Sequence, residues 1–114
     1  MSENTQIAQT ILEQLGGRRL IVMTGARNFI AIERGLSFRV PRAKDGINVI
    51  TVELTPADDY TVTFSRLRRA KGAYAPTRTV VSKHDGIYCD QLQDLFLRAT
   101  GLETRLPRFI TEAS

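Results

Sequence analysis

Apolar residues recur at helical spacing near both ends of the chain. Over residues 3–15 they follow the i, i+4, i+5, i+8 pattern of one buried stripe, which comprises Ile7, Ala8, Ile11, Leu12 and Leu15. Gly16-Gly17 ends that segment. Residues 87–100 repeat the pattern, with a stripe of Tyr88, Leu92, Leu95, Phe96 and Ala99. Gly101 follows where helices commonly stop, so the spacing predicts two amphipathic helices, 3–15 and 87–100.

Between these helices the apolar period falls from 3.6 to 2, which is typical of strands. The strongest pattern lies at 47–54, whose alternate apolar residues are Ile50, Val52 and Leu54. Residues 60–65 alternate in the same way, and the short connection between the two runs predicts an antiparallel hairpin. The other strand-like runs are 20–23, 29–33, 36–40 and 78–83.

We therefore expect one α+β domain over residues 1–114. Its antiparallel sheet has five to six strands, and the N-terminal and C-terminal helices pack on one face, with the other face solvated and basic. The parts in chain order are the helix 3–15, a strand-rich basic centre 20–83, the helix 87–100 and a tail 103–114. A length of 114 residues fits a single core.

Composition favours a soluble, cytoplasmic protein. No apolar run approaches the roughly 18 to 20 residues that a membrane-spanning helix needs. The first residues are polar and acidic, without the basic start and apolar block of a secretory signal. The single cysteine, Cys89, excludes an internal disulfide and a cysteine-rich zinc site. We expect no cofactor and no bound metal.

Positive charge is concentrated in the strand-rich centre. The whole chain carries a net charge of +4, but residues 18–83 hold 13 basic and five acidic side chains, a net charge of +8. The flanking segments 1–17 and 84–114 each carry −2. Ten of the 13 basic residues are arginine, whose planar guanidinium group suits bidentate contact with phosphate or carboxylate. This distribution favours an anionic partner.

Candidate catalytic side chains are few. His84 is the only histidine, and its charged neighbours indicate an exposed turn or a helix cap, with Asp85 placed to cap the second helix. Cys89 lies near the start of that helix, where the pKa of a thiol falls. No partner base is evident for it, and a small, partly buried side chain is the simpler interpretation. We therefore expect no enzyme and no catalytic residue.

The basic centre gives the stronger functional signal. A sheet face with Arg34 and Arg39 is expected beside the most basic segment, 66–76. Arginine and lysine there can follow phosphates, while an aromatic ring or a guanidinium plane stacks on bases. The candidate nucleic-acid-binding residues are Arg39, Arg66, Arg68, Arg69, Lys71 and Tyr74. The alternative interpretation is a basic surface that is only solvated.

Several segments resemble a family of small proteins encoded by bacteriophages, prophages and other mobile elements. The clearest are MTGARNF at residues 23–29 and TPADDYTVTF at residues 55–64, and further likeness lies in 36–42 and 87–102. The resemblance spans most of the chain. It implies a mobile-element setting in the cytoplasm of a bacterial host, and it supplies no catalytic residues.

The expected function is that of a non-enzymatic accessory protein that binds nucleic acid through a basic sheet face and the segment 66–71. The alternative is an anti-defence inhibitor, of the anti-CRISPR type, or an adaptor that contacts a host protein complex through Phe109-Ile110 or a sheet edge. The basic charge argues against a mimic of DNA, which would be acidic. An uncovered sheet edge could also support a homodimer.

Overall fold

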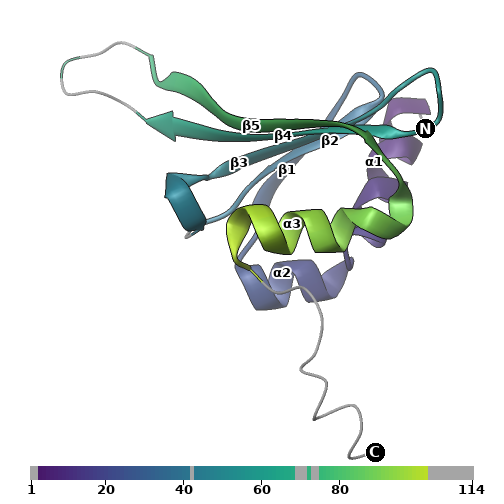
Figure 1. The fold of residues 1–114 in the computed structure, drawn as a ribbon, viewed down its shortest axis with the longest axis horizontal. Coiled ribbons are helices and arrows are strands. Elements are labelled where there is room, and N and C mark those ends of the chain that lie inside the picture. The colour runs from purple at the N-terminus through teal and green to yellow at the C-terminus, as the bar shows by residue number, and fades with distance from the viewer. Residues whose placement is uncertain (1–2, 42, 69–71, 73–74, 103–114) are drawn as a thin grey trace, which may run out of the picture.

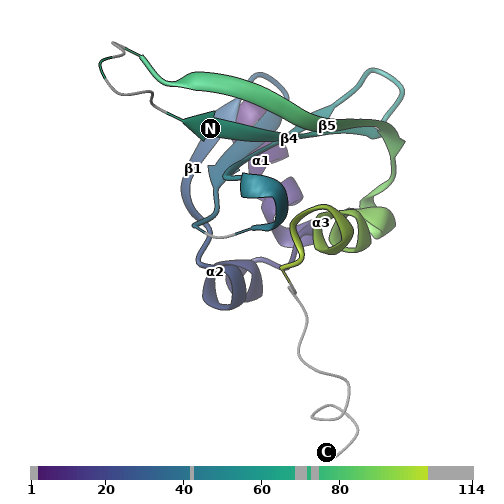
Figure 2. The same cartoon turned by 60° about the vertical axis from the view of Figure 1, so that its left-hand side comes forward.

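In the residues that the structure describes, five antiparallel strands form one sheet, and three α-helices lie on one side of it (Figures 1 and 2). The computed structural model describes residues 3–41, 43–68, 72 and 75–102. The helices and short helical turns are α1 (Glu3–Gln14), α2 (Arg18–Thr24), η1 (Lys44–Gly46), η2 (Cys89–Gln91) and α3 (Leu92–Thr100). The strands are β1 (Arg27–Ile32), β2 (Gly35–Arg39), β3 (Val49–Leu54), β4 (Tyr60–Arg68) and β5 (Thr77–Ile87).

Each strand pairs with its neighbour in the chain, in the order β1-β2-β3-β4-β5. The edges of the sheet are therefore β1 and β5. With nine and eleven residues, β4 and β5 are longer than the other strands. Their hairpin extends beyond the rest of the sheet (Figure 1). The predicted α+β class, the hairpin of β3 and β4, and the helices on one face are confirmed.

The helix-facing side of the sheet carries the alternating apolar residues that the sequence pattern predicts. The buried residues on this side include Leu36, Phe38, Ile50, Val52, Tyr60, Val62 and Phe64. The helices cover them mainly with Ile11, Leu15, Leu20, Leu92, Leu95 and Phe96. The Phe38 ring centroid lies 5.3 Å from that of Phe29 and 6.2 Å from that of Phe96. Burial of each such side chain contributes about 1.5–3 kcal/mol, so this cluster joins β1, β2 and α3.

The prediction of a strand at Leu20–Met23 is wrong, because these residues belong to the seven-residue helix α2. Leu20 and Thr24, four positions apart, are buried together, and the Thr24 hydroxyl donates a hydrogen bond to the Leu20 carbonyl. Gly25, in the left-handed region at φ 74°, closes the helix by donating its N–H to Ile21. Periodicity cannot separate a short apolar run in a helix from one in a strand. Here the helical conformation allows Leu20 to pack into the core, and this packing outweighs the strand preference of the residues.

The β4–β5 hairpin also differs from the prediction. β4 continues to Arg68 and β5 continues to Ile87, so both strands take residues that we expected in loops or in the second helix. Asp85 is consequently not a helix cap. It lies in β5 and accepts a hydrogen bond from the Thr61 hydroxyl at 3.0 Å. Tyr88 precedes the turn η2 instead, and its backbone N–H donates to the Gln91 side-chain oxygen at 2.9 Å.

Candidate functional site

The strand register brings five arginines to one end of the sheet. Arg27 pairs with Arg39 across β1 and β2. Arg66 and Arg68 are at the end of β4, and Arg78, near the start of β5, pairs with Leu67 between them. Because β1 and β5 begin where β2 and β4 end, all five lie at the end from which the β4–β5 hairpin projects (Figure 1). We call this region the basic end.

The opposite end of the sheet carries mainly carboxylates. They belong to the turns and strand ends there, and comprise Glu33, Glu53, Asp58, Asp59 and Asp85. We call these residues the acidic end. Arg34 lies among them, and its guanidinium group pairs with Glu3 of α1 at 3.3 Å. The expectation that Arg34 joins Arg39 on a binding face is therefore wrong.

The basic end uses both faces of the sheet. Successive side chains of a strand point to opposite faces, and the buried Phe38 and Phe64 point toward the helices. Arg39 follows Phe38 and therefore lies on the open face, where it is exposed as predicted. Arg66 and Arg68 follow Phe64 by two and four residues, so both lie on the helix side. Guanidinium groups are thus present above and below the sheet.

The open face is less basic than we predicted. By the same alternation it includes Ile30 of β1 and Val80 of β5, which are 59% and 56% exposed. At the acidic end it also includes the exposed Glu53. It also carries the exposed Lys83, opposite Thr63 of β4, so its positive charge is concentrated at the basic end but extends along β5.

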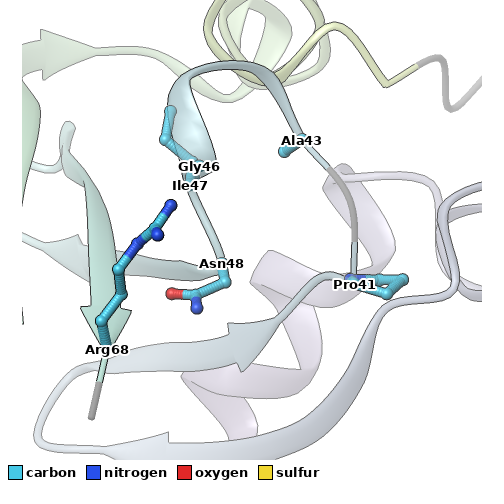
Figure 3. Close-up of a pocket in the computed structure, with 6 residues that line it drawn as sticks. All are labelled: Pro41, Ala43, Gly46, Ile47, Asn48 and Arg68. Atoms are coloured by element: carbon cyan, nitrogen blue, oxygen red, sulfur yellow. The ribbon is translucent and has the colours of Figure 1, made fainter. Parts of the chain in front are cut away.

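On the helix side, Arg66 and Arg68 converge on the turn η1. A Cβ built on Gly46 would lie 2.7 Å from Arg68 Nη2 and 3.3 Å from Arg66 Nε. Figure 3 shows Arg68 extending from β4 toward Gly46 and Ile47 across a pocket of about 400 Å³. Gly46 itself has φ +72°, a conformation in which glycine is least strained. The missing side chain leaves room for two guanidinium groups at one turn.

Asn48 fixes the end of β4 beside this pocket. Its Nδ2 donates to the Leu67 carbonyl at 2.8 Å, and its Oδ1 accepts the Leu67 N–H at 2.7 Å. Leu67 lies between Arg66 and Arg68, so this pair of bonds holds both arginines against η1. We did not predict a role for Asn48. The only signal for it in the sequence is a single amide inside the apolar run 47–54.

The two guanidinium groups are not neutralised within the described part of the chain. Neither Arg66 nor Arg68 pairs there with a carboxylate, and Arg66 Nε is buried without a hydrogen-bond partner. Buried polar atoms are nearly always hydrogen-bonded, so an exception calls for an explanation. Two cations held close together also repel each other. An oxyanion between them would relieve both costs, because guanidinium groups bind phosphate or carboxylate oxygens through parallel hydrogen bonds.

The other predicted site residues lie outside the described residues or differ from expectation. Arg69, Lys71 and Tyr74 lie outside the described residues. His84 is not in an exposed turn but half-buried in β5, with its ring 5.8 Å from that of Phe64 and a ring nitrogen 3.2 Å from the Ser82 hydroxyl. Cys89 is exposed in η2 rather than partly buried. Among the described residues, no cluster of histidine, cysteine and carboxylate groups could hold a metal ion.

Comparison of the chain with protein-family models, with curated proteins and with solved structures finds no significant match. In the part of the chain that the structure describes, no helix is both long and apolar enough to cross a membrane.

Proposed function

We propose that this protein is a non-enzymatic accessory protein of a phage or mobile element that binds nucleic acid through the basic end. The observation that carries the proposal is the convergence of Arg66 and Arg68 on η1 without a carboxylate partner in the described residues. The resemblance to mobile-element proteins supports the setting. The net charge of +8 over residues 18–83 supports an anionic macromolecule as the partner.

The geometry favours contact with the sugar–phosphate backbone. Arg39 on the open face and Arg68 on the helix side are both exposed, so one phosphate chain passing over the end of the sheet can meet each of them. A guanidinium group binds phosphate as a planar fork. Contacts of this kind give affinity with little preference for base sequence, and they weaken steeply with salt because counterions are released on binding.

The proposal assigns no reaction to the protein. The histidine ring packs against Phe64 and shares a hydrogen bond with Ser82, which gives it a structural role in β5. Cys89 is exposed, and its turn presents no basic side chain of its own, since η2 comprises Cys89, Asp90 and Gln91.

The proposal is tested by fluorescence anisotropy with labelled single-stranded and double-stranded oligonucleotides between about 50 and 200 mM salt. We expect binding of the full chain that falls steeply over this range. Arg68→Glu should weaken it on the order of tenfold for all base sequences alike. The control is Arg19→Glu, which makes the same charge change at an exposed position of α2. Salt-insensitive binding, or none to either kind of oligonucleotide, would reject the proposal.

A second candidate function is contact with a host protein, as an anti-defence inhibitor or adaptor. It is favoured by α2, where the adjacent Ile21 and Val22 are 42% and 74% exposed. Phe109-Ile110, which we also considered for such contact, lies outside the described residues. Under this alternative, a nuclease-treated host lysate should yield one stoichiometric partner, and Val22→Glu should abolish its recovery. Retention of the partner by Val22→Glu would contradict a role for α2.

A further inference from the structure

A second pocket lies between β5 and α3, on the helix side of the sheet, with a volume of about 410 Å³. It arises because α3 packs its Phe96 against Phe38 of β2, which leaves the helix side of the edge strand β5 partly uncovered. A bulge in β5 shapes it further. Phe64 pairs with Ser82 and the next residue of β4 pairs with Val80, so Val81 is the extra residue and contributes to the pocket wall.

The pocket combines an apolar floor with a polar and cationic rim. The floor includes Ile47, Val81, Leu95 and Ala99, which come from three separate segments of the chain. Lys44 and Arg98 stand on the rim together with one carboxylate, Asp45. Ser82 and His84 add hydroxyl and imidazole groups. A pocket of this size that combines apolar side chains with hydrogen-bonding groups can accept a small organic ligand.

The turn from Lys44 to Ile47 separates this pocket from the pocket of Figure 3. Gly46 and Ile47 line the pocket that holds Arg68, whereas Lys44, Asp45 and Ile47 line the pocket beneath β5. A chain with a phosphate at Arg66 and Arg68 therefore needs to cross only this turn to reach the second pocket. Lys44 lies on the connecting turn and provides a further cation along that path.

We propose that the pocket between β5 and α3 accepts one unstacked base of a single-stranded nucleic acid whose backbone lies on the basic end. This inference rests on the proposed function. The aliphatic floor suits the face of a base, while Ser82 and His84 suit its polar edge, and Lys44 and Arg98 attract the adjoining phosphate. A duplex is disfavoured because its bases must first be unpaired and unstacked.

The location of each contact is tested by two-dimensional NMR of the isotope-labelled full chain. The probes are inorganic phosphate, a short single-stranded oligothymidylate, an abasic oligomer of equal length and a duplex of equal length. Phosphate, the abasic oligomer and the duplex should shift backbone amides near Gly46, Arg66 and Arg68. Only the oligothymidylate should also shift the amides of Val81 and His84. Confinement of its shifts to the first group would overturn the inference.

A pocket-filling variant tests the same inference by affinity. Ala99→Phe places a ring in the pocket and should weaken binding of the oligothymidylate about fivefold or more, to the level of the abasic oligomer. Its binding of the abasic oligomer should be unchanged. Ala31→Phe, at an exposed position of β1, is the matched control. Should Ala99→Phe unfold, Ser82→Ala serves instead and should lower the affinity for the oligothymidylate severalfold but not the affinity for the abasic oligomer.

The outcomes separate the two proposals. Equal, salt-dependent affinity of the wild-type protein for the base-bearing and abasic oligomers would reject the base pocket while leaving the backbone contact intact. Failure of the wild-type protein to bind any oligomer would reject the proposed function and, with it, the base pocket.

Discussion

The two ends of the sheet are built from the same five strands, but their charged groups have different surroundings. At the acidic end, several of the charged groups are bonded within the protein. The Asp59 carboxylate accepts a hydrogen bond from the Thr55 hydroxyl at 2.5 Å, and Arg34 pairs with Glu3 at 3.3 Å. At the basic end, Arg66 Nε is buried without a hydrogen-bond partner among the described residues.

The comparison distinguishes charged side chains that stabilise the fold from charged side chains that can bind a ligand. Bonds at the acidic end close the β3–β4 turn and join α1 to the sheet. At the basic end, Asn48 bonds the backbone of Leu67 and leaves the neighbouring guanidinium groups unpaired with carboxylates of the described residues. Substitutions at the acidic end should therefore leave oligonucleotide binding unchanged, whereas substitutions that remove or displace the arginines of the basic end should weaken it.

The largest effect on stability is expected from Gly35→Ala at the acidic end. A Cβ there would overlap the backbone carbonyl oxygen of Val52 in the neighbouring strand and would lie 3.1 Å from the Glu53 Cα. Because backbone atoms cannot move aside cheaply, the free energy of unfolding should fall by about 3 kcal/mol or more.

Gly46→Ala at the basic end is the comparison. This substitution should lower the free energy of unfolding by roughly 1–2 kcal/mol because of the positive φ. It should also weaken oligonucleotide binding by displacing Arg68. Urea unfolding measures both variants, and equal losses of stability would contradict the comparison.

A smaller effect is expected from Asn48→Ala. It removes both hydrogen bonds to Leu67 and should lower stability by about 1–3 kcal/mol. It should also weaken oligonucleotide binding, because Arg66 and Arg68 lose their fixed position. The control is Asn4→Ala at the acidic end, which removes one bond from the Arg34 N–H at 2.9 Å. If both variants bind oligonucleotides as the wild type does, Asn48 has no positioning role.

A pH-dependent effect is expected at Tyr60, where β4 begins at the acidic end. The side chain is 6% exposed, and its hydroxyl donates a hydrogen bond to Gln14 at 2.7 Å. Burial raises the pKa of Tyr60 above its usual 10.0. Above pH 10 the unfolded state therefore loses the phenol proton first, and stability falls as the pH rises.

Tyr60→Phe should abolish this Tyr60-dependent loss of stability, which urea unfolding at pH 8 and at about pH 10.5 would detect. Tyr88→Phe, at a side chain that is 59% exposed, is the control. An equal loss of stability on alkalinisation in wild type and Tyr60→Phe would show that Tyr60 is not its source.

The smallest effect is expected from Glu3→Gln, which breaks the ion pair with Arg34. Both side chains are largely exposed, at 76% and 40%, and exposed pairs of this kind contribute about 0–1 kcal/mol. The midpoint temperature of thermal unfolding should fall by no more than a few degrees. Oligonucleotide binding should be unchanged. A clear loss of binding would show that the acidic end takes part in it.

The sequence pattern predicted the parts of the fold in which periodicity is long and regular. The predicted helix at residues 3–15 is confirmed as α1, Glu3–Gln14. The predicted alternation is also confirmed, since Phe38, Val52 and Phe64 are buried in the core. Both patterns extend over several turns of helix or several strand pairs, which makes them easy to recognise in a sequence. The helix α2 was missed because its residues 20–23 are apolar and include the β-branched Ile21 and Val22, which favour strands when packing is ignored.

The candidate site was less predictable than the fold. The composition of the centre pointed to Arg39, Arg66 and Arg68 as candidate binding residues, and this assignment stays a prediction. The position of Arg39 on one face of the sheet and of Arg66 and Arg68 on the other depends on how the strands pair. The convergence of Arg66 and Arg68 on Gly46 depends on a turn about 20 residues earlier in the chain. The role of Asn48 depends on the same long-range pairing, so a single sequence reveals only a polar residue in an apolar run.

The central claim, that the basic end holds phosphates, is tested most directly by the salt dependence of oligonucleotide affinity. Because Arg66 and Arg68 converge on one phosphate position, the double variant Arg66→Ala/Arg68→Ala should reduce the slope of log K against log salt by about 0.7 for single strands, the value for one phosphate that is no longer neutralised. Arg18→Ala/Arg19→Ala, which removes two exposed arginines from α2, should leave the slope as in the wild type. Equal slopes in both double variants would contradict the claim.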